Sequence, residues 1–187
     1  MPSVFFKNYL RELNNIFGDI NSKEFEVFIG ELIVAYERQS NIFICGNGGS
    51  ASTASHFACD INKGVGFGKD KRFKVICLND NIPTLLAYAN DISYDDVFVE
   101  QLKNFMVKND LVIGVSGSGN SGNILKAIEY ANKNGGNTFG ICGYDGGKLK
   151  TLAQKSMVIQ SNDMQKVEDI HMIVIHCAMQ YLCGYLK

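Results

Sequence analysis

The chain has 187 residues, of which 46% are hydrophobic and 20% charged, as is typical of a globular protein with a sizeable core. Its 18 basic and 19 acidic residues give a formal net charge of -1, which argues against nucleic acid or an anionic membrane as partner. No apolar run in the sequence reaches the length of a membrane span, and residues 1–17 lack the ordered parts of a signal peptide. Cys45, Cys77 and Cys142 lie within apolar runs, which indicates reduced core cysteines, so we expect a cytoplasmic protein.

Helix-like and strand-like patterns alternate along the chain. Two helical patterns come first, at about residues 3–18 and 23–39. Five short, nearly continuous apolar runs follow, at 41–46, 73–78, 110–116, 137–143 and 155–161. Helical patterns separate these runs at about 50–62, 83–105 (with a break), 121–134 and 147–154, and a longer one follows at about 165–186.

Apolar runs of this kind are typical of strands buried on both faces of a parallel sheet. Their alternation with helices predicts an α/β fold, a three-layer sandwich built on a five-stranded parallel sheet. No linker or repeat divides the sequence, so we expect one domain over residues 1–187 with a helical N-terminal extension at about 1–39. In such folds ligands bind beyond the carboxyl ends of the strands.

A glycine-rich turn follows the first predicted strand, within the stretch CGNGGSASTASHFACD (residues 45–60). Its glycines allow a close approach between backbone and ligand, and Ser50 is placed to cap the next helix. The free N–H groups at the start of that helix favour an anion. A tight turn before a capped helix explains the same residues, so this motif alone does not decide between the two interpretations.

A second turn of similar design, VSGSGNSGN (residues 115–123), follows the third predicted strand. It is neither a Walker loop nor a dinucleotide-binding fingerprint, because it has no G-K-[ST] and no acidic ribose partner at the right distance. Its three hydroxyls, Ser116, Ser118 and Ser121, stand directly before another helix. Two such turns at one edge of a sheet indicate a site for a small phosphate monoester.

The three histidines of the chain lie in two predicted helices. His56 and Asp60 share one helix face, where they suit a metal, acid–base chemistry or a plain surface hydrogen bond. Glu168 and His171 are three residues apart, which is also a metal-ligand spacing. His176 stands in an apolar stretch, either as a ligand or as a core histidine that needs a polar partner. Because all three histidines lie in only two helices, a functional role is favoured over a chance placement.

The stretches CGNGGSASTASHFACD and GVSGSGNSGNILKAIEYA resemble the sugar-isomerase (SIS) domain. HFACD together with EDIHMIVIH is similar to the phosphoheptose isomerases, which convert sedoheptulose 7-phosphate to glycero-manno-heptose 7-phosphate. The resemblance runs from about residue 42 to the end, and the helical N-terminus also fits. It implies a cytoplasmic homotetramer with sites near subunit interfaces, working in heptose supply for a lipopolysaccharide or capsule.

The resemblance also implies roles for individual residues. Substrate contacts are implied for Asn47, Gly48, Gly49, Ser50, Asn90, Asp91, Ser116, Gly117, Ser118, Ser121 and Glu168. The implied ligands of a Zn²⁺ ion are His56, Asp60, Glu168 and His176. Within this set Asp60 is the expected catalytic base and His176 the expected catalytic acid.

Three positions depart from the family pattern. Gly117 stands where the family usually has threonine, Asp60 where it has glutamate and Glu168 where it has glutamine. These departures leave open an isomerase for a different phosphosugar, or a non-catalytic SIS protein of the kind associated with replication initiation. Because such non-catalytic relatives lose the acidic residue of the first helix or the last histidine, the presence of Asp60 and His176 favours catalysis. Glu168 and His176 are also about 12 Å apart along a helix, so they share one ion only by reaching toward each other or from different chains.

Overall fold

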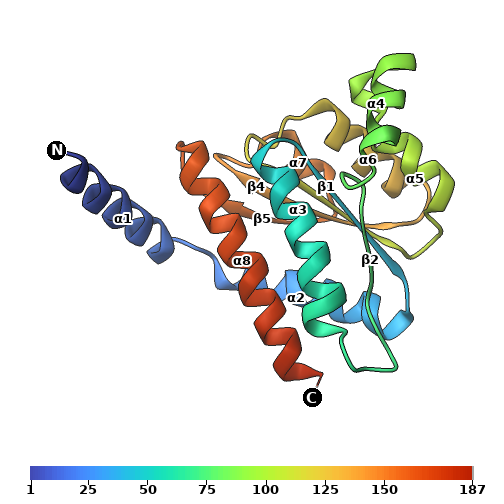
Figure 1. The fold of residues 1–187 in the computed structure, drawn as a ribbon, viewed down its shortest axis with the longest axis horizontal. Coiled ribbons are helices and arrows are strands. Elements are labelled where there is room, and N and C mark those ends of the chain that lie inside the picture. Colours follow the sequence, from blue (N-terminus) through green and yellow to red (C-terminus); the bar gives the residue numbers. More distant parts are fainter. Residues whose placement is uncertain (187) are drawn as a thin grey trace.

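A five-stranded parallel sheet forms the centre of the molecule (Figure 1). The structure is a computed structural model that describes residues 1–186. The strands are β1 (Asn41–Gly46), β2 (Lys74–Cys77), β3 (Leu111–Ser116), β4 (Asn137–Gly143) and β5 (Lys155–Ile159), in the order β2-β1-β3-β4-β5. All neighbouring strands pair in parallel, which confirms the predicted fold class.

The chain has eight α-helices within residues 1–186, most of which flank the sheet, and their bounds follow the predicted pattern closely. They are α1 (Pro2–Gly18), α2 (Ser22–Arg38), α3 (Gly49–Cys59), α4 (Ile82–Asp91), α5 (Val99–Phe105), α6 (Gly122–Lys133), α7 (Gly147–Leu152) and α8 (Met164–Tyr185). The predicted break within 83–105 holds a 3-10 turn, η2 (Tyr94–Asp96). The helix predicted for 50–62 continues past α3 as a π-helix, η1 (Asp60–Val65), which the sequence pattern did not indicate.

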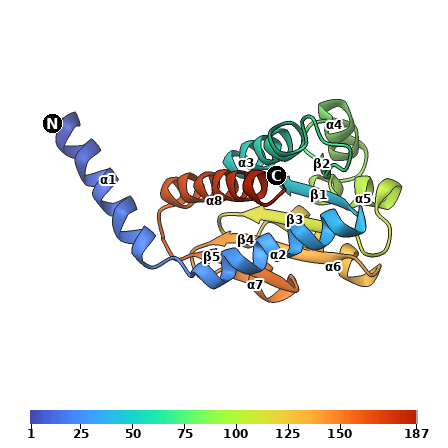
Figure 2. The ribbon, with the colours of Figure 1, turned by 90° about the horizontal axis from the view of Figure 1, so that it is seen from below.

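Each face of the sheet has its own hydrophobic core. Alternate strand residues such as Ile42, Ile113 and Phe139 pack against α2, α3 and α8 on one face. The residues between them, such as Phe43 and Val112, pack against α5, α6 and α7 on the other face. This arrangement is the predicted three-layer sandwich, and Figure 2 shows α3 and α8 lying together above the sheet.

Several helix starts follow ordinary capping chemistry. Asn81 accepts a hydrogen bond from the backbone N–H of Thr84, and Pro83 stands in the first turn of α4, a position that suits proline. The prediction that Ser50 caps α3 is wrong. That helix begins one residue earlier, at Gly49, because Gly48 turns the chain with a positive φ of 55° that glycine adopts without strain.

Helix α1 projects from the body of the molecule, as both views show (Figures 1 and 2). The middle of α1 is held to α8, where the hydroxyl of Tyr9 donates to Asp169 Oδ2 at 2.6 Å. Glu12 pairs with Lys166 Nζ at 2.9 Å beside it. The outer part carries Phe5 and Phe6, which are 72% and 62% exposed. None of the helices in residues 1–186 combines the length and apolar character needed to cross a lipid bilayer.

Candidate active site

The strand order brings the two glycine- and serine-rich turns together. Strand β1 pairs with β2 on one side and β3 on the other, so the direction of winding reverses between β1 and β3. Gly46 pairs with Val115 at the carboxyl ends of these strands. Ligands of doubly wound folds bind in the crevice at this switch point.

A pocket of about 260 Å³ opens between the two turns. Its lining comprises Asn47, Gly48, Gly49, Ser50, Val115, Ser116, Gly117, Ser118, Ser121, Met164 and Glu168. Nine of the eleven substrate-contact residues implied by the sequence therefore line one pocket; Asn90 and Asp91 are the two outside it. Val115 and Met164 complete the lining and were not expected.

The chemistry of this pocket suits an anion held by neutral donors. Among the lining residues none is lysine or arginine. Helices α3 and α6 both begin at its edge, with their free N–H groups and positive dipole ends. Ser116 Oγ and Ser121 Oγ lie 3.2 Å apart, and the Ser121 side chain makes no capping bond to α6, so its hydroxyl is available to a ligand.

Gly117 and Gly49 lie in close contact with the side chains of Met164 and Glu168. A Cβ atom on Gly117 would overlap the Met164 sulfur, so the glycine that replaces the family's usual threonine and this methionine fit together. A Cβ on Gly49 would overlap the carboxylate of Glu168. That carboxylate thus lies at the amino end of α3, where the helix dipole favours a negative charge.

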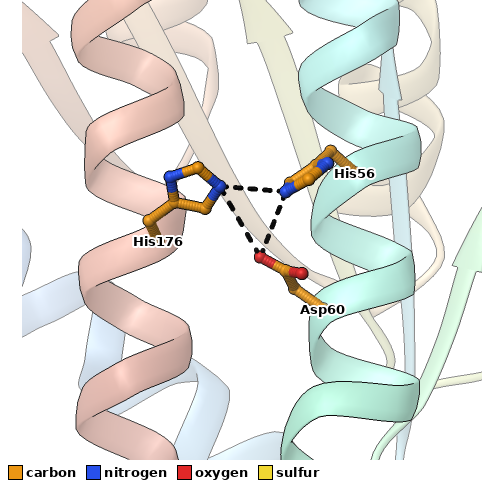
Figure 3. Close-up of side chains that lie close together, drawn as sticks. All are labelled: His56, Asp60 and His176. Atoms are coloured by element: carbon orange, nitrogen blue, oxygen red, sulfur yellow. Dashed lines mark hydrogen bonds and ion pairs between the residues drawn. The ribbon is translucent and has the colours of Figure 1, made fainter.

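The second part of the site is a cluster of His56, Asp60 and His176 between α3 and α8 (Figure 3). Asp60 Oδ2 lies 3.4 Å from His56 Nε2 and 3.9 Å from His176 Nε2. The two Nε2 atoms are 2.9 Å apart. One potential ligand atom of each residue therefore points into a common space, as a metal site requires.

The donor atoms of this cluster fit a divalent cation. Asp60 Oδ2 is buried and has no hydrogen-bond partner among the described residues, which is costly for a carboxylate oxygen unless a cation faces it. Imidazole nitrogen and carboxylate oxygen are both ordinary zinc ligands. Asp60 is also the first residue of the π-helix η1, and such irregular turns frequently mark functional sites.

Glu168 is not part of this cluster. It lies on α8 two turns before His176 and lines the pocket between the serine turns instead. Its role as a fourth metal ligand therefore stays a prediction. Asn90 and Asp91 lie exposed at the end of α4, where Asn90 Nδ2 donates to Asp91 Oδ1 at 2.8 Å. Their substrate contact also stays a prediction.

His171 is a core histidine and not a metal ligand, although its spacing from Glu168 suggested one. The side chain is fully buried, and its Nε2 lies 3.0 Å from the carbonyl oxygen of Cys142, to which it donates as a neutral ring. Burial lowers the pKa of His171 to about 4. Its spacing from Glu168 alone did not exclude His171 as a ligand, whereas the family resemblance assigned the ligand role to His176.

We expect His171 to make the fold sensitive to mild acid. Below about pH 6.5 the unfolded chain protonates this histidine while the folded chain does not, so the free energy of unfolding falls as the pH drops toward 4. The loss is about 2 kcal/mol at pH 5. Urea unfolding at pH 7 and pH 5 measures it, with His171→Gln as the variant that keeps a donor for the Cys142 carbonyl. An equal loss in both proteins would contradict the assignment.

Further residues of the site gave no clear signal in the sequence. Asn79 holds the end of β1, since its amide accepts from Gly46 N at 3.1 Å and donates to Gly46 O at 2.8 Å. Asn123 and Tyr94 contact Asn47 of the first turn. Only their positions beside the turns, visible once the strands are paired, indicate a role.

The fold and the pocket define a SIS-domain protein. The profile of the SIS domain family matches residues 8–143. The phosphoheptose isomerase of Helicobacter pylori (strain ATCC 700392 / 26695) is 43% identical over 78% of this chain and 75% of its own length. That of Aliarcobacter butzleri (strain RM4018) is 38% identical over the whole of both chains.

Solved structures agree with the sequence relatives. The phosphoheptose isomerase of Neisseria gonorrhoeae superposes with a TM-score of 0.91, covering 98% of this chain and all of that one, at 22% identity. That of Francisella tularensis gives 0.89 over 97% and 98%, at 19% identity. At this identity they show a shared fold. The sequence relatives show that the chain belongs to the phosphoheptose isomerase family, which confirms the predicted class of enzyme.

Proposed function

We propose that the chain interconverts sedoheptulose 7-phosphate and D-glycero-D-manno-heptose 7-phosphate. The observation that carries the proposal is the paired arrangement of the anion pocket and the His–Asp–His cluster along α3 and α8. From Gly49 to His56 and from Glu168 to His176 the two helices rise by about 10–12 Å. An extended seven-carbon sugar phosphate has a similar length, so its phosphate reaches the pocket while its carbonyl end reaches the cluster.

The isomerisation moves one proton between the two carbons at the carbonyl end. A base removes the proton from the carbon next to the ketone, which gives an enediol, and returns it to the former carbonyl carbon. Asp60 is the proposed base: Oδ2 faces the two imidazoles, so Oδ1 is left to take the proton. His176 is the proposed acid that moves a proton between the two substrate oxygens.

A divalent metal, proposed to be one Zn²⁺ per site, belongs to this mechanism. His56, Asp60 and His176 would hold it, joined by Glu168 of the same or a neighbouring chain. When bound, it supplies a Lewis acid that polarises a carbonyl. The two serine turns of the pocket hold the distant phosphate in this proposal, and this binding energy orients the reacting carbons at Asp60.

The proposed reaction is tested by incubating the zinc-loaded protein with sedoheptulose 7-phosphate and following the products by NMR. We expect a new aldose anomeric signal from a heptose 7-phosphate, because the base and acid are both present in the cluster. The matched control is the same protein after chelation. Turnover of a shorter ketose phosphate alone would support the isomerase of a different phosphosugar, and no turnover of any phosphosugar would support the non-catalytic alternative.

We further propose that the enzyme is a cytoplasmic homo-oligomer, a tetramer by family resemblance. Helix α1 exposes Val4, Phe5, Phe6 and Leu10 on the part that projects from the body. Large apolar side chains that lie exposed together on one helix are typical of an interface. Oligomerisation would also bring residues of a second chain near the His–Asp–His cluster, for which one chain supplies three potential ligands.

The oligomer is tested by light scattering. We expect a mass of about four times the 20.7 kDa chain, because burial of the α1 face stabilises the assembly. Phe5→Ser with Phe6→Ser removes apolar area from that face and is expected to shift the mass downward. Lys7→Ser on the same helix is the matched control. A stable monomer in the unmodified chain would contradict the proposal.

A further inference from the structure

A small network of side-chain hydrogen bonds holds the glycine-rich turn that follows β1. Asn47 Nδ2 donates to Asn123 Oδ1 at 2.9 Å, and Asn123 Nδ2 donates back to Asn47 Oδ1 at 3.0 Å. The hydroxyl of Tyr94 donates to Asn47 Oδ1 at 2.9 Å. Asn123 is only 1% exposed and lies on α6, so the network joins the turn after β1 to the helix after β3.

The orientation of both amides follows from one backbone group. The N–H of Ile124 can only donate, and it lies 2.9 Å from one amide atom of Asn123, which must therefore be the oxygen. The nitrogen of Asn123 then faces the oxygen of Asn47. Because that oxygen can only accept, the hydroxyl of Tyr94 must be the donor in its bond to Asn47.

The side chain of Asn47 has only one hydrogen-bonding group left for a ligand. An amide oxygen accepts two hydrogen bonds, and Asn47 Oδ1 already receives both, from Asn123 and Tyr94. The nitrogen carries two hydrogens, and one of them is used for Asn123. The side chain therefore offers the pocket a single N–H and no acceptor.

We propose that Asn123 and Tyr94 are positioning residues that keep Asn47 a hydrogen-bond donor toward the phosphate pocket. The pocket lining has no lysine or arginine, and its one charged side chain, Glu168, is acidic, so its selectivity for an anion depends on which way its neutral dipoles point. A flipped Asn47 would present its oxygen to the phosphate and oppose binding. The inference deepens the proposed function and rests on its assignment of the pocket to phosphate.

The inference is tested with inorganic phosphate, whose binding is measured by calorimetry and needs no turnover. Tyr94→Phe removes one hydroxyl from a side chain that is 59% exposed, so the fold is expected to survive. Asn123→Ser removes the amide partner. Each variant is expected to weaken phosphate binding about fivefold, as the loss of one hydrogen bond does, and to raise KM for the sugar phosphate by a similar factor with kcat within twofold.

A double variant separates positioning from general loss of stability. Because both residues act through Asn47, Tyr94→Phe is expected to add little once Asn123→Ser is present. The matched control is Asn132→Ser, which removes an amide on the same helix that donates to the Leu152 carbonyl at 2.8 Å, away from the pocket. It is expected to lower stability and leave phosphate affinity and KM unchanged.

Unchanged phosphate affinity in either single variant would overturn the inference, and so would fully independent effects in the double variant. An unmodified protein that binds no phosphate would overturn it as well. A protein that binds phosphate with these variant effects but isomerises no heptose phosphate would instead contradict the proposed reaction, so the two failures are distinguishable.

Discussion

Replacing Asp60 by asparagine is expected to lower turnover about 10³-fold, within the range that a general base contributes. The amide keeps the size of the side chain but can no longer accept the proton that the isomerisation moves. The fold and phosphate binding are expected to stay intact, because the pocket that holds the phosphate is formed by other residues. Steady-state kcat, phosphate calorimetry and a thermal melt measure the three quantities on one preparation.

Asp80→Asn is the matched control for this change. Its carboxylate accepts a hydrogen bond from Ser55, one residue before His56, but it is exposed and is not part of the His–Asp–His cluster. The control is expected to keep kcat within about twofold, as surface changes away from a site do. Full activity of Asp60→Asn, in a preparation verified to contain the substitution, would rule out Asp60 as the base.

The fold was predictable because each of its signals is local. Buried strands of a parallel sheet are apolar on both faces, so runs such as 41–46 and 110–116 were recognisable without any partner. The break expected within 83–105 marked a helix limit in the same way. The two turns of the pocket were found because ligand sites follow strand ends, even though the pairing of β1 with β3 was not known.

The direction of side chains on α8 was not predictable from the sequence. His171 and His176 are five residues apart, which turns them about 140° from each other on a helix, so only one can face α3. His171 packs in the core and His176 lies in the cluster, because the packing of α8 determines which of its faces is turned toward α3. The π-helix at Asp60 and the capping of α3 by Gly48 were missed for a related reason, since small backbone shifts leave no pattern in the residues.

Replacing His176 by alanine is expected to abolish both zinc binding and turnover. Loss of a residue that merely orients a metal ligand costs about 10–100-fold in metal affinity, so loss of a ligand is expected to cost at least as much. The measurement is zinc affinity and zinc content after chelation and readdition, with kcat determined on the same samples. His171→Gln is the matched control on the same helix and is expected to keep its zinc, because His171 faces the core.

The variant Glu168→Gln tests the position at which this chain has glutamate and the family has glutamine. The carboxylate lies against Gly49 and not within the cluster of its own chain. Because glutamine is the residue that the family has at this position, this variant is expected to keep activity and its zinc to within about tenfold. A large loss of zinc in Glu168→Gln would mean that a neighbouring chain supplies this carboxylate to the site. Undiminished zinc binding in His176→Ala would instead contradict the assignment of the cluster, because Asp60 and His56 alone leave too few ligands for a stable site.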